Sequence, residues 1–403
     1  MINTSSSQSK LVFVHVVITF LIFGNCWWFF DVSHHPDLSK SSAPAASRVH
    51  SPYLPSLSAT ELCDLSHGGW VVDSHPPLYT NATCMHIHPS QNCLQNARPD
   101  KGYLNWRWKP AMCELPLFDG AQFLDLMRGK RLVLIGDSIA RNHLQSLHCA
   151  LSQVESPQNL YSDERLKAFT WHYSSYNFTL ANLWSPFLVN HSVEQNLYKL
   201  HLDVPDRAWT SQLQQYDVII ISTGYWYFRP SLYYFKDSVL GANSFSQLNV
   251  TTVKLVPTLK IALKSVFNYI AKEYKGLVML RTVTVDHFEY GSWNDGGVCN
   301  RTSPYFETDN LPSLPWMNSE INKVQIKEFG KAAAMSREPW RYEILNVTYS
   351  AFLRPDGHPG PYRIQEPSEP VFDCLHWCLP GPIDMWNQLV LHTLRKYLSR
   401  KIV

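Results

Sequence analysis

The sequence has little net charge and no compositional bias. Among its 403 residues, 35 Lys and Arg stand against 33 Asp and Glu, which leaves a formal net charge of +2. Proteins that bind nucleic acid usually carry a clear basic excess, so we expect no nucleic-acid partner. Charged residues make up 17% and apolar residues 45%, which excludes a disordered chain and a coiled coil. The chain has no internal repeat, and its Pro and Gly follow no period, which excludes collagen-like and low-complexity proteins.

Long hydrophobic runs are rare, and the longest lies near the N-terminus. Leu11 to Phe30 contains no Asp, Glu, Lys or Arg, and as a helix it would span roughly 30 Å, the thickness of the bilayer core. A cleaved signal peptide is the alternative, but the aromatic residues Trp27 to Phe30 suit a membrane interface better than a cleavage site. Lys10 precedes the run and Asp31 follows it. We therefore predict a cytosolic tail (1–10), a transmembrane signal-anchor (11–30) and a type II, single-pass orientation.

Cysteines and glycosylation sequons support a luminal location for the rest of the chain. Of nine Cys, one (Cys26) lies in the predicted membrane segment, and an even set remains, as four disulfides would require. Reduced thiols in a cytosolic enzyme are the alternative. The luminal cysteines are Cys63, Cys84, Cys93, Cys113, Cys149, Cys299, Cys374 and Cys378. The sequons begin at Asn81, Asn177, Asn190, Asn249, Asn300 and Asn346.

The chain after the predicted membrane segment divides into three parts. Residues 31–58 are rich in Ser, Pro, Ala and His and predict a flexible stem. Residues 59–115 predict a loop-rich subdomain held by disulfides, and residues 116–403 a larger domain. In that domain, apolar runs predict strands at 131–135, 216–222 and 276–283, and a further strand is predicted at 341–347. Helices are predicted at 139–151, 258–274, 319–337 and 382–398. This alternation predicts a three-layer α/β sandwich with a mainly parallel central sheet.

A candidate nucleophile follows the first of these strands. Gly136-Asp137-Ser138 comes where strand 131–135 ends and the next helix begins, the position at which such sheets bind ligands. Gly136 permits a sharp turn, and the N–H groups of the following helix face any oxyanion formed at Ser138. A simple helix cap is the alternative role for Ser138.

A candidate base and its acid lie near the C-terminus. In Asp373-Cys374-Leu375-His376, the carboxylate can hold one imidazole nitrogen while the other nitrogen takes a proton from a serine. His358 is the rival base. His86 and His88 lack an evident third ligand, so we predict no metal site.

These motifs resemble the plant trichome birefringence-like family, the wall polysaccharide O-acetyltransferases of the Golgi. The blocks that match extend over almost the whole chain from Leu62 onward. They are Cys63-Asp64, Tyr103 with Trp106-Arg107-Trp108 and Pro110, Gly136-Asp137-Ser138, Arg281, His287-Phe288-Glu289, Trp293-Asn294, Leu353 to Asp356, and Asp373 to Gly381.

The resemblance implies an SGNH-hydrolase-like fold with Ser138, His376 and Asp373 as a catalytic triad. It implies Gly224 in the oxyanion hole, with Asn294 as a second donor and Asn142 as the alternative. Trp226, Arg229 and Trp293 become candidates for substrate binding, and Trp106, Trp108 and Trp377 for the same aromatic platform. The disulfide pairs implied by analogy are Cys63–Cys113, Cys84–Cys149, Cys93–Cys378 and Cys299–Cys374.

The expected activity is transfer of an acetyl group to a hemicellulose hydroxyl through an acetyl-serine. Trp226 to Pro230 (WYFRP) resembles the xyloglucan branch of the family, while mannan, xylan and pectin stay open as acceptors. No bound cofactor is expected, and the acetyl donor is acetyl-CoA or another acetyl carrier. The resemblance also implies a Golgi membrane location. The alternatives are a polysaccharide acetyl esterase and a non-catalytic wall-glycan-binding protein.

Overall fold

The computed structural model describes residues 63–402, apart from 164–166, 245, 307–310 and 364–370. The predicted tail, membrane segment and stem therefore lie outside the described residues. Within the described part, no helix combines the length and the apolar character that crossing a bilayer requires.

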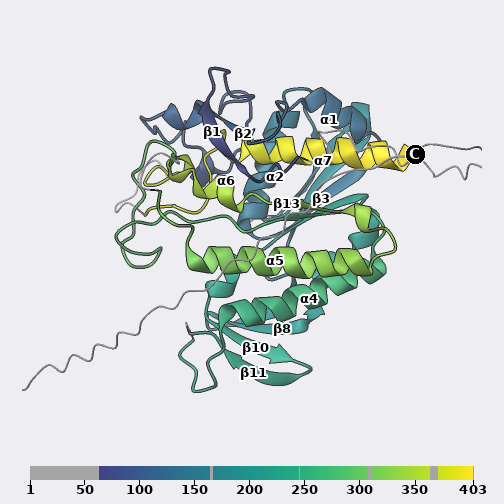
Figure 1. The fold of residues 1–403 in the computed structure, drawn as a ribbon, viewed down its shortest axis with the longest axis vertical. Coiled ribbons are helices and arrows are strands. Elements are labelled where there is room, and N and C mark those ends of the chain that lie inside the picture. Colours follow the sequence, from purple (N-terminus) through teal and green to yellow (C-terminus); the bar gives the residue numbers. More distant parts are fainter. Residues whose placement is uncertain (1–62, 164–166, 245, 307–310, 364–370, 403) are drawn as a thin grey trace, which may run out of the picture. The chain divides into compact units, whose positions relative to one another are not determined.

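A mixed β-sheet forms the centre of the described part (Figure 1). Its strand order is β13-β12-β9-β3-β6-β5-β4. The strands from β13 to β6 run parallel, whereas β5 and β4 are added antiparallel. The bounds are β3 (Arg131–Gly136), β4 (Gln158–Ser162), β5 (Phe169–Tyr173), β6 (Phe178–Trp184), β9 (Val218–Ser222), β12 (Leu277–Arg281) and β13 (Tyr342–Leu345).

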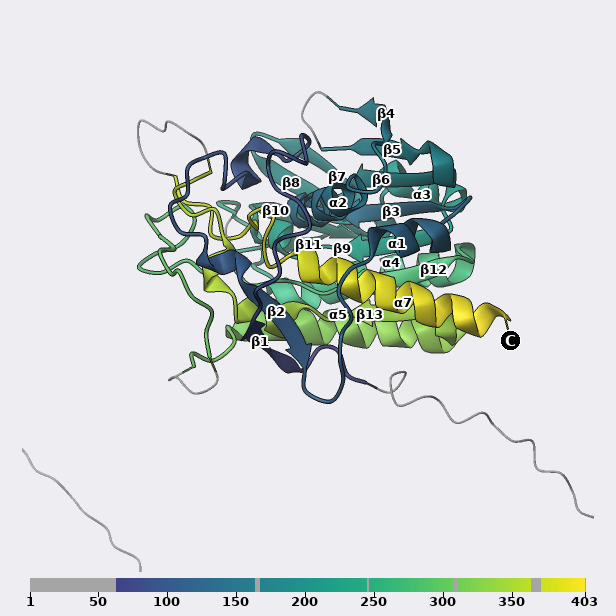
Figure 2. The same cartoon turned by 90° about the horizontal axis from the view of Figure 1, so that it is seen from above.

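Helices cover both faces of this sheet (Figures 1 and 2). In β3, Leu132 and Leu134 belong to one buried cluster, whereas Val133 and Ile135 belong to the other, because successive side chains of a strand point to opposite faces. The first cluster contains α1 (Gly120–Leu126), α2 (Ser138–Leu151) and α7 (Asp384–Ile402), and the second contains α3 (Arg207–Thr210), α4 (Leu255–Glu273) and α5 (Trp316–Met335). The predicted three-layer sandwich is therefore present.

Two smaller sheets were not predicted. One has the order β11-β10-β8-β7 and packs on α4, where Leu200 and Tyr233 join the cluster of that helix. The other pairs β1 with β2 antiparallel in the N-terminal part. Their bounds are β1 (Gly68–Val72), β2 (Trp106–Pro110), β7 (Val189–Glu194), β8 (Leu197–Pro205), β10 (Ser231–Phe235) and β11 (Ser238–Ala242).

The predicted strands and helices of the large domain are present, with ends shifted by a few residues. The expected last helix begins at Asp384 rather than at Pro382, because Gly381 and Pro382 form a turn whose carbonyl oxygens accept from the N–H groups of Asp384 and Met385. The mainly parallel sheet is corrected to a mixed one, since β4 and β5 run antiparallel. All five residues of β4 are exposed, so its sequence gives no apolar strand signal.

Four disulfides are present: Cys63–Cys113, Cys84–Cys149, Cys93–Cys378 and Cys299–Cys374. This is the pairing that the family resemblance implied. Two of them hold the segment around His376, since Cys374 and Cys378 bond to Cys299 and Cys93. The N-terminal part and the loop after β12 are thereby tied to the C-terminal segment.

Candidate active site

The turn from β3 to α2 positions Ser138. A Cβ added to Gly136 would lie 1.9 Å from the carbonyl oxygen of Ser222 on β9, so only glycine fits between these strands. The carboxylate of Asp137 accepts hydrogen bonds from the N–H groups of Ile139 (3.0 Å) and Ala140 (3.4 Å). Ser138 is the half-buried first residue of α2, and its own N–H is not used by this cap.

Two buried ionisable side chains, Asp137 of this turn and Arg281 at the end of β12, influence each other. Burial raises the pKa of Asp137 even though the nearby Arg281 opposes the shift. Burial lowers the pKa of Arg281 to about 10, against the attraction of Asp137. The electrostatic influence of His376 also reaches Asp137.

Asp373 holds the ring of His376. The imidazole Nδ1 lies 2.9 Å from Oδ2 and 3.1 Å from Oδ1 of Asp373, and the N–H groups of Leu375 and His376 also donate to Oδ1. Burial alone would raise the pKa of Asp373, but the charge and hydrogen bonds of His376 outweigh burial and hold it well below its usual range. Because Nδ1 donates to this carboxylate, Nε2 is left as a proton acceptor. Nε2 is buried and has no hydrogen-bond partner among the described residues.

Asn142 connects the nucleophile helix to the catalytic loop, which we define as residues Asp373–Trp377. Its Oδ1 accepts from the backbone N–H of Trp377 at 2.7 Å, and its Nδ2 donates to the carbonyl oxygen of Trp377 at 3.3 Å. Asn142 is fully buried one turn after Ser138. The Ser138 hydroxyl and His376 are not hydrogen-bonded to each other, as is common before substrate binds. The side-chain amide of Asn142, the alternative oxyanion donor, is engaged with the peptide groups of Trp377.

His287 and His358 lie behind the catalytic loop. His358 Nδ1 is 2.7 Å from the carbonyl oxygen of His376, and its Nε2 is 2.7 Å from Nδ1 of His287. Both ring nitrogens of His358 are thus engaged, so it has none left to take a proton from a serine, and its role as rival base is excluded. Sequence reasoning did not find this contact between the two rings. The only signal was that both residues lie in or beside blocks that resemble the family.

The two predicted oxyanion donors have different surroundings. Gly224 follows β9, the neighbour of β3, and precedes the 3-10 turn Tyr225–Phe228, so it lies at the same sheet edge as Ser138. Asn294 lies in an exposed loop, where its Oδ1 accepts a hydrogen bond from the hydroxyl of Ser292.

Residues 115–393 match the family model of PC-Esterase, described as the GDSL/SGNH-like acyl-esterase family found in Pmr5 and Cas1p. The chain belongs to this family. Residues 61–114 match the model of the PMR5 N-terminal domain. The chain is 38% identical to protein trichome birefringence-like 25 of Arabidopsis thaliana, over 97% of this chain and 94% of that protein. It is 41% identical to xyloglucan O-acetyltransferase 4 of Populus trichocarpa and to xyloglucan O-acetyltransferase 1 of Arabidopsis thaliana, over 83% of this chain and 81% of each relative. The resemblance to the trichome birefringence-like family is confirmed.

In this member of the PC-Esterase family, the candidate substrate-binding residues form two groups. The guanidinium carbon of Arg229 lies 4.3 Å from the ring centre of Trp226, a cation–π contact, and Trp226 packs edge-on against Trp184 at 5.3 Å. Trp293 stands apart in the loop after β12 and is 69% exposed. Of the other predicted platform residues, Trp108 and Trp377 are buried in the core.

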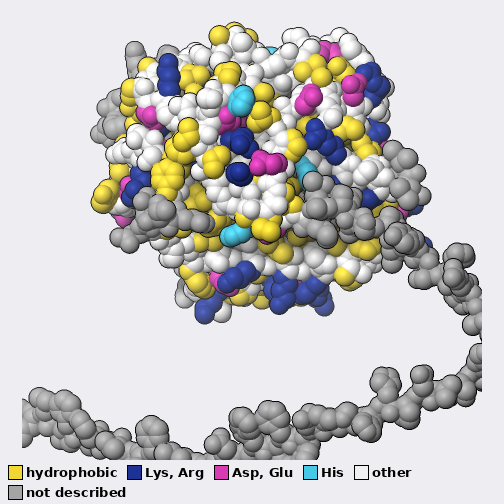
Figure 3. All heavy atoms as spheres, turned by 45° about the horizontal axis from the view of Figure 1, so that its top comes forward, with side chains coloured by type: hydrophobic (Ala, Val, Ile, Leu, Met, Phe, Trp, Pro, Cys, Tyr) yellow, Lys and Arg dark blue, Asp and Glu magenta, His cyan; other side chains and the backbone are white. Residues whose placement is uncertain are grey.

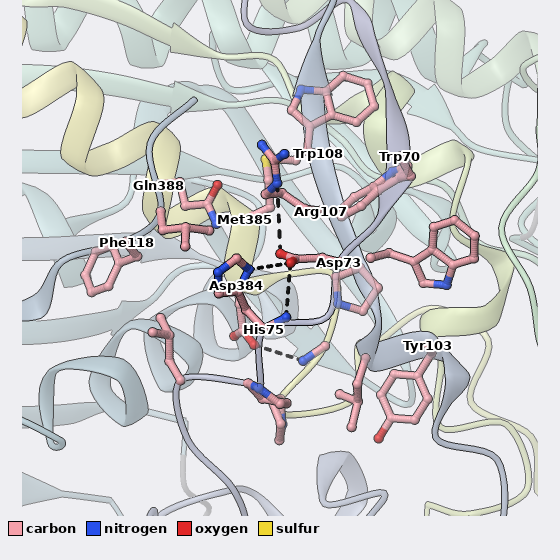
Figure 4. A pocket seen from close by; sticks show the side chains of 18 of the residues that line it. Trp70, Asp73, His75, Tyr103, Arg107, Trp108, Phe118, Asp384, Met385 and Gln388 are labelled. Atoms are coloured by element: carbon pink, nitrogen blue, oxygen red, sulfur yellow. Dashed lines mark hydrogen bonds and ion pairs between the residues drawn. The ribbon is translucent and has the colours of Figure 1, made fainter. Parts of the chain in front are cut away.

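A cavity of about 330 Å³ lies between the N-terminal strands and the start of α7 (Figure 4). Trp106 and Tyr103 line it, together with the segment from Pro380 to Pro382 that follows the catalytic loop. Asp73 is paired with His75 and Arg107 on its wall. Of the predicted platform residues, Trp106 and Trp108 thus line this cavity, together with Trp70.

The surface of the described residues mixes charges of both signs with hydrophobic side chains on the face shown in Figure 3. Of the sequon asparagines, Asn177, Asn190, Asn249 and Asn300 are exposed, whereas Asn81 and Asn346 are half-buried. Among the described residues, no group of three or more His, Cys, Asp or Glu side chains is arranged to hold a metal ion.

Proposed function

We propose that this protein is a polysaccharide O-acetyltransferase that acetylates a hydroxyl of xyloglucan through an acetyl-serine at Ser138. The observation that carries the proposal is the pair of hydrogen bonds between Asn142 and Trp377. They join the helix that starts at Ser138 to the loop that carries His376 and Asp373. The names of the xyloglucan O-acetyltransferases at 41% identity support the reaction and the acceptor.

The first half-reaction forms the acetyl-enzyme. His376 Nε2 takes the hydroxyl proton of Ser138 while Oγ attacks the acetyl carbonyl carbon of the donor. Asp373 stabilises the imidazolium through the hydrogen bond to Nδ1. The backbone N–H groups of Ser138 and Gly224 are the proposed donors to the tetrahedral oxyanion. When the intermediate collapses, the bond to the donor breaks and the proton on Nε2 passes to the leaving group.

The second half-reaction reverses these steps with the glycan. A sugar hydroxyl gives its proton to His376 Nε2 and attacks the acetyl carbon, and the bond from that carbon to Ser138 Oγ then breaks. The proton returns to Ser138. Transfer instead of hydrolysis requires that the bound glycan exclude water at this step.

The acceptor contacts that we propose are aromatic. Sugar rings present C–H faces that pack on indole rings, so Trp226 with Arg229 and the exposed Trp293 are the candidates for binding the glycan. The proposal extends to a Golgi membrane location with the described residues in the lumen, in agreement with four disulfides. Acetyl-CoA or another acetyl carrier is the proposed donor.

The test is a transfer assay with the full-length protein produced in a eukaryotic secretory host. In separate reactions, it is incubated with acetyl-CoA and one deacetylated oligosaccharide, derived from xyloglucan, mannan or xylan. The masses of the products are then measured by mass spectrometry. We expect one added acetyl on xyloglucan, lost in Ser138→Ala. Removal of acetyl groups from acetylated xyloglucan without transfer would instead make the protein an esterase. Identical products with wild type and Ser138→Ala would refute catalysis by Ser138.

A further inference from the structure

Two buried histidines outside the triad form an unbroken hydrogen-bonded chain behind the catalytic loop. His287 Nε2 lies 2.9 Å from the carbonyl oxygen of Phe352, His287 Nδ1 lies 2.7 Å from His358 Nε2, and His358 Nδ1 lies 2.7 Å from the carbonyl oxygen of His376. Both side chains are buried, at 8% and 3% exposure. The ring of His358 also packs at 4.3 Å on Trp377.

The number of protons in this chain follows from its ends. Carbonyl oxygens only accept hydrogen bonds, so the outer nitrogen of each imidazole must carry a proton. The central contact between the two rings needs a third proton. Two neutral imidazoles hold only two, and any arrangement of two protons leaves a pair of lone pairs facing each other at hydrogen-bond distance.

We propose that His287 and His358 share one extra proton, so that the pair carries a single positive charge and positions His376 through its backbone carbonyl. The two rings are hydrogen-bonded to each other and to the carbonyl oxygens of Phe352 and His376, not to Ser138. The two histidines are therefore positioning residues, which act on the reaction through the catalytic loop.

The cationic side chains near the pair are already compensated. Arg98, from the N-terminal part, donates to the carbonyl oxygen of His358 at 2.8 Å and is paired with Asp100 at 2.9 Å. Arg301, from the loop after β12, is paired with Glu289 at 2.6 Å. Each guanidinium thus has its own carboxylate, which reduces its repulsion of a charge on the pair.

The anion that faces the pair is the carboxylate of Asp373. Arg363 contributes only the smallest of the effects on this carboxylate. Burial opposes a charge on either ring: it lowers the pKa of His287 to about 4 and, together with the charge of His287, holds the pKa of His358 well below its usual value. The carbonyl oxygen of His376 and the carboxylate of Asp373 favour a charge on His358. The hydrogen-bond count decides between these effects, because the neutral pair cannot satisfy all three contacts.

The positive charge of the pair can be removed while the hydrogen bond from His358 Nδ1 to the carbonyl oxygen of His376 is kept. In His287→Gln, the amide group can donate to Nε2 of a neutral His358, whose Nδ1–H still donates to the carbonyl oxygen of His376. Loss of a positive charge near the triad favours protonation of His376. We expect the acid limb of the pH profile of kcat/KM, measured with p-nitrophenyl acetate, to move up by about one pH unit. His201→Gln, on the second sheet, is the matched control and should keep the wild-type profile.

A second measurement does not depend on activity. In full-length protein labelled with 15N-histidine, NMR of the imidazole nitrogens should show three protonated nitrogens of the four in the pair, assigned by the loss of signals in His287→Gln and His358→Gln. The kinetic arm rests on the proposed function and the NMR arm does not, so their failures can be told apart. Two protonated nitrogens in the wild type, or a folded His287→Gln with an unmoved acid limb, would overturn the shared charge.

Discussion

The two hydrogen bonds between Asn142 and Trp377, which we call the clamp, hold the catalytic loop on α2. Replacing Asn142 tests whether this clamp serves catalysis or only stability. Asn142→Ala removes both hydrogen bonds to Trp377, which leaves a buried N–H and a buried carbonyl oxygen unpaired. Each unpaired group costs about 1–3 kcal/mol. Because the bond to the N–H is short and the one to the oxygen is long, we expect a loss of roughly 2–4 kcal/mol in the free energy of unfolding.

The same substitution should lower activity beyond its effect on folding. The loop carries His376, and a shift of about 1 Å in a catalytic group lowers rates by roughly 100-fold. Acetyl transfer and p-nitrophenyl acetate hydrolysis should therefore fall together, at temperatures where circular dichroism shows the variant to be folded.

Asn387→Ala is the matched control. Asn387 is equally buried on α7 and donates at 2.7 Å to the hydroxyl of Ser146 on α2 rather than to the catalytic loop. It should lose stability and keep the kcat/KM of the wild type. If Asn142→Ala loses stability but keeps wild-type kcat/KM, the clamp does not position His376 and the geometric argument for the site fails.

Three further predictions concern the same edge of the sheet. Ser138→Ala should abolish transfer while its free energy of unfolding stays within about 0.5 kcal/mol of the wild-type value. A variant that still transfers would contradict the assignment of Ser138 as the nucleophile. The low pKa of Asp373 stabilises the fold above about pH 4, its unfolded value, and this contribution is lost as pH falls toward the folded value. The difference in free energy of unfolding between wild type and Asp373→Asn should therefore narrow below pH 4 in urea titrations. A difference that stays constant with pH would refute the ion pair between Asp373 and His376. Gly136→Ala should destabilise the protein by more than about 3 kcal/mol because its Cβ meets Ser222, whereas Gly330→Ala, in open space on α5, should be neutral or stabilising in the same titration.

The sequence allowed the central sheet and its helices to be predicted because their signals are local. The buried strands β3, β9 and β12 are apolar throughout, and α4 repeats apolar residues at helical spacing. The exposed strand β4 and the half-buried strand β8 carry no such run, since their residues are fixed by pairing with neighbours. The antiparallel edge and the second sheet were missed for that reason.

The candidate site divides in the same way. Asp373 and His376 are three residues apart, so their contact could be expected from the sequence. The clamp of Asn142 on Trp377 joins residues 235 positions apart, and no local sequence pattern predicts this contact. The contact between His287 and His358 likewise arises only when distant loops are folded together.

The most direct test of the account is the site at which the enzyme itself becomes acetylated. Full-length protein is mixed with acetyl donor in the absence of glycan, quenched in acid, digested and analysed by peptide mass spectrometry. The account predicts a single acetyl group on Ser138, which disappears when deacetylated xyloglucan oligosaccharide is added before the quench. An acetyl group on another residue that passes to the glycan, or glycan acetylation by Ser138→Ala, would contradict it.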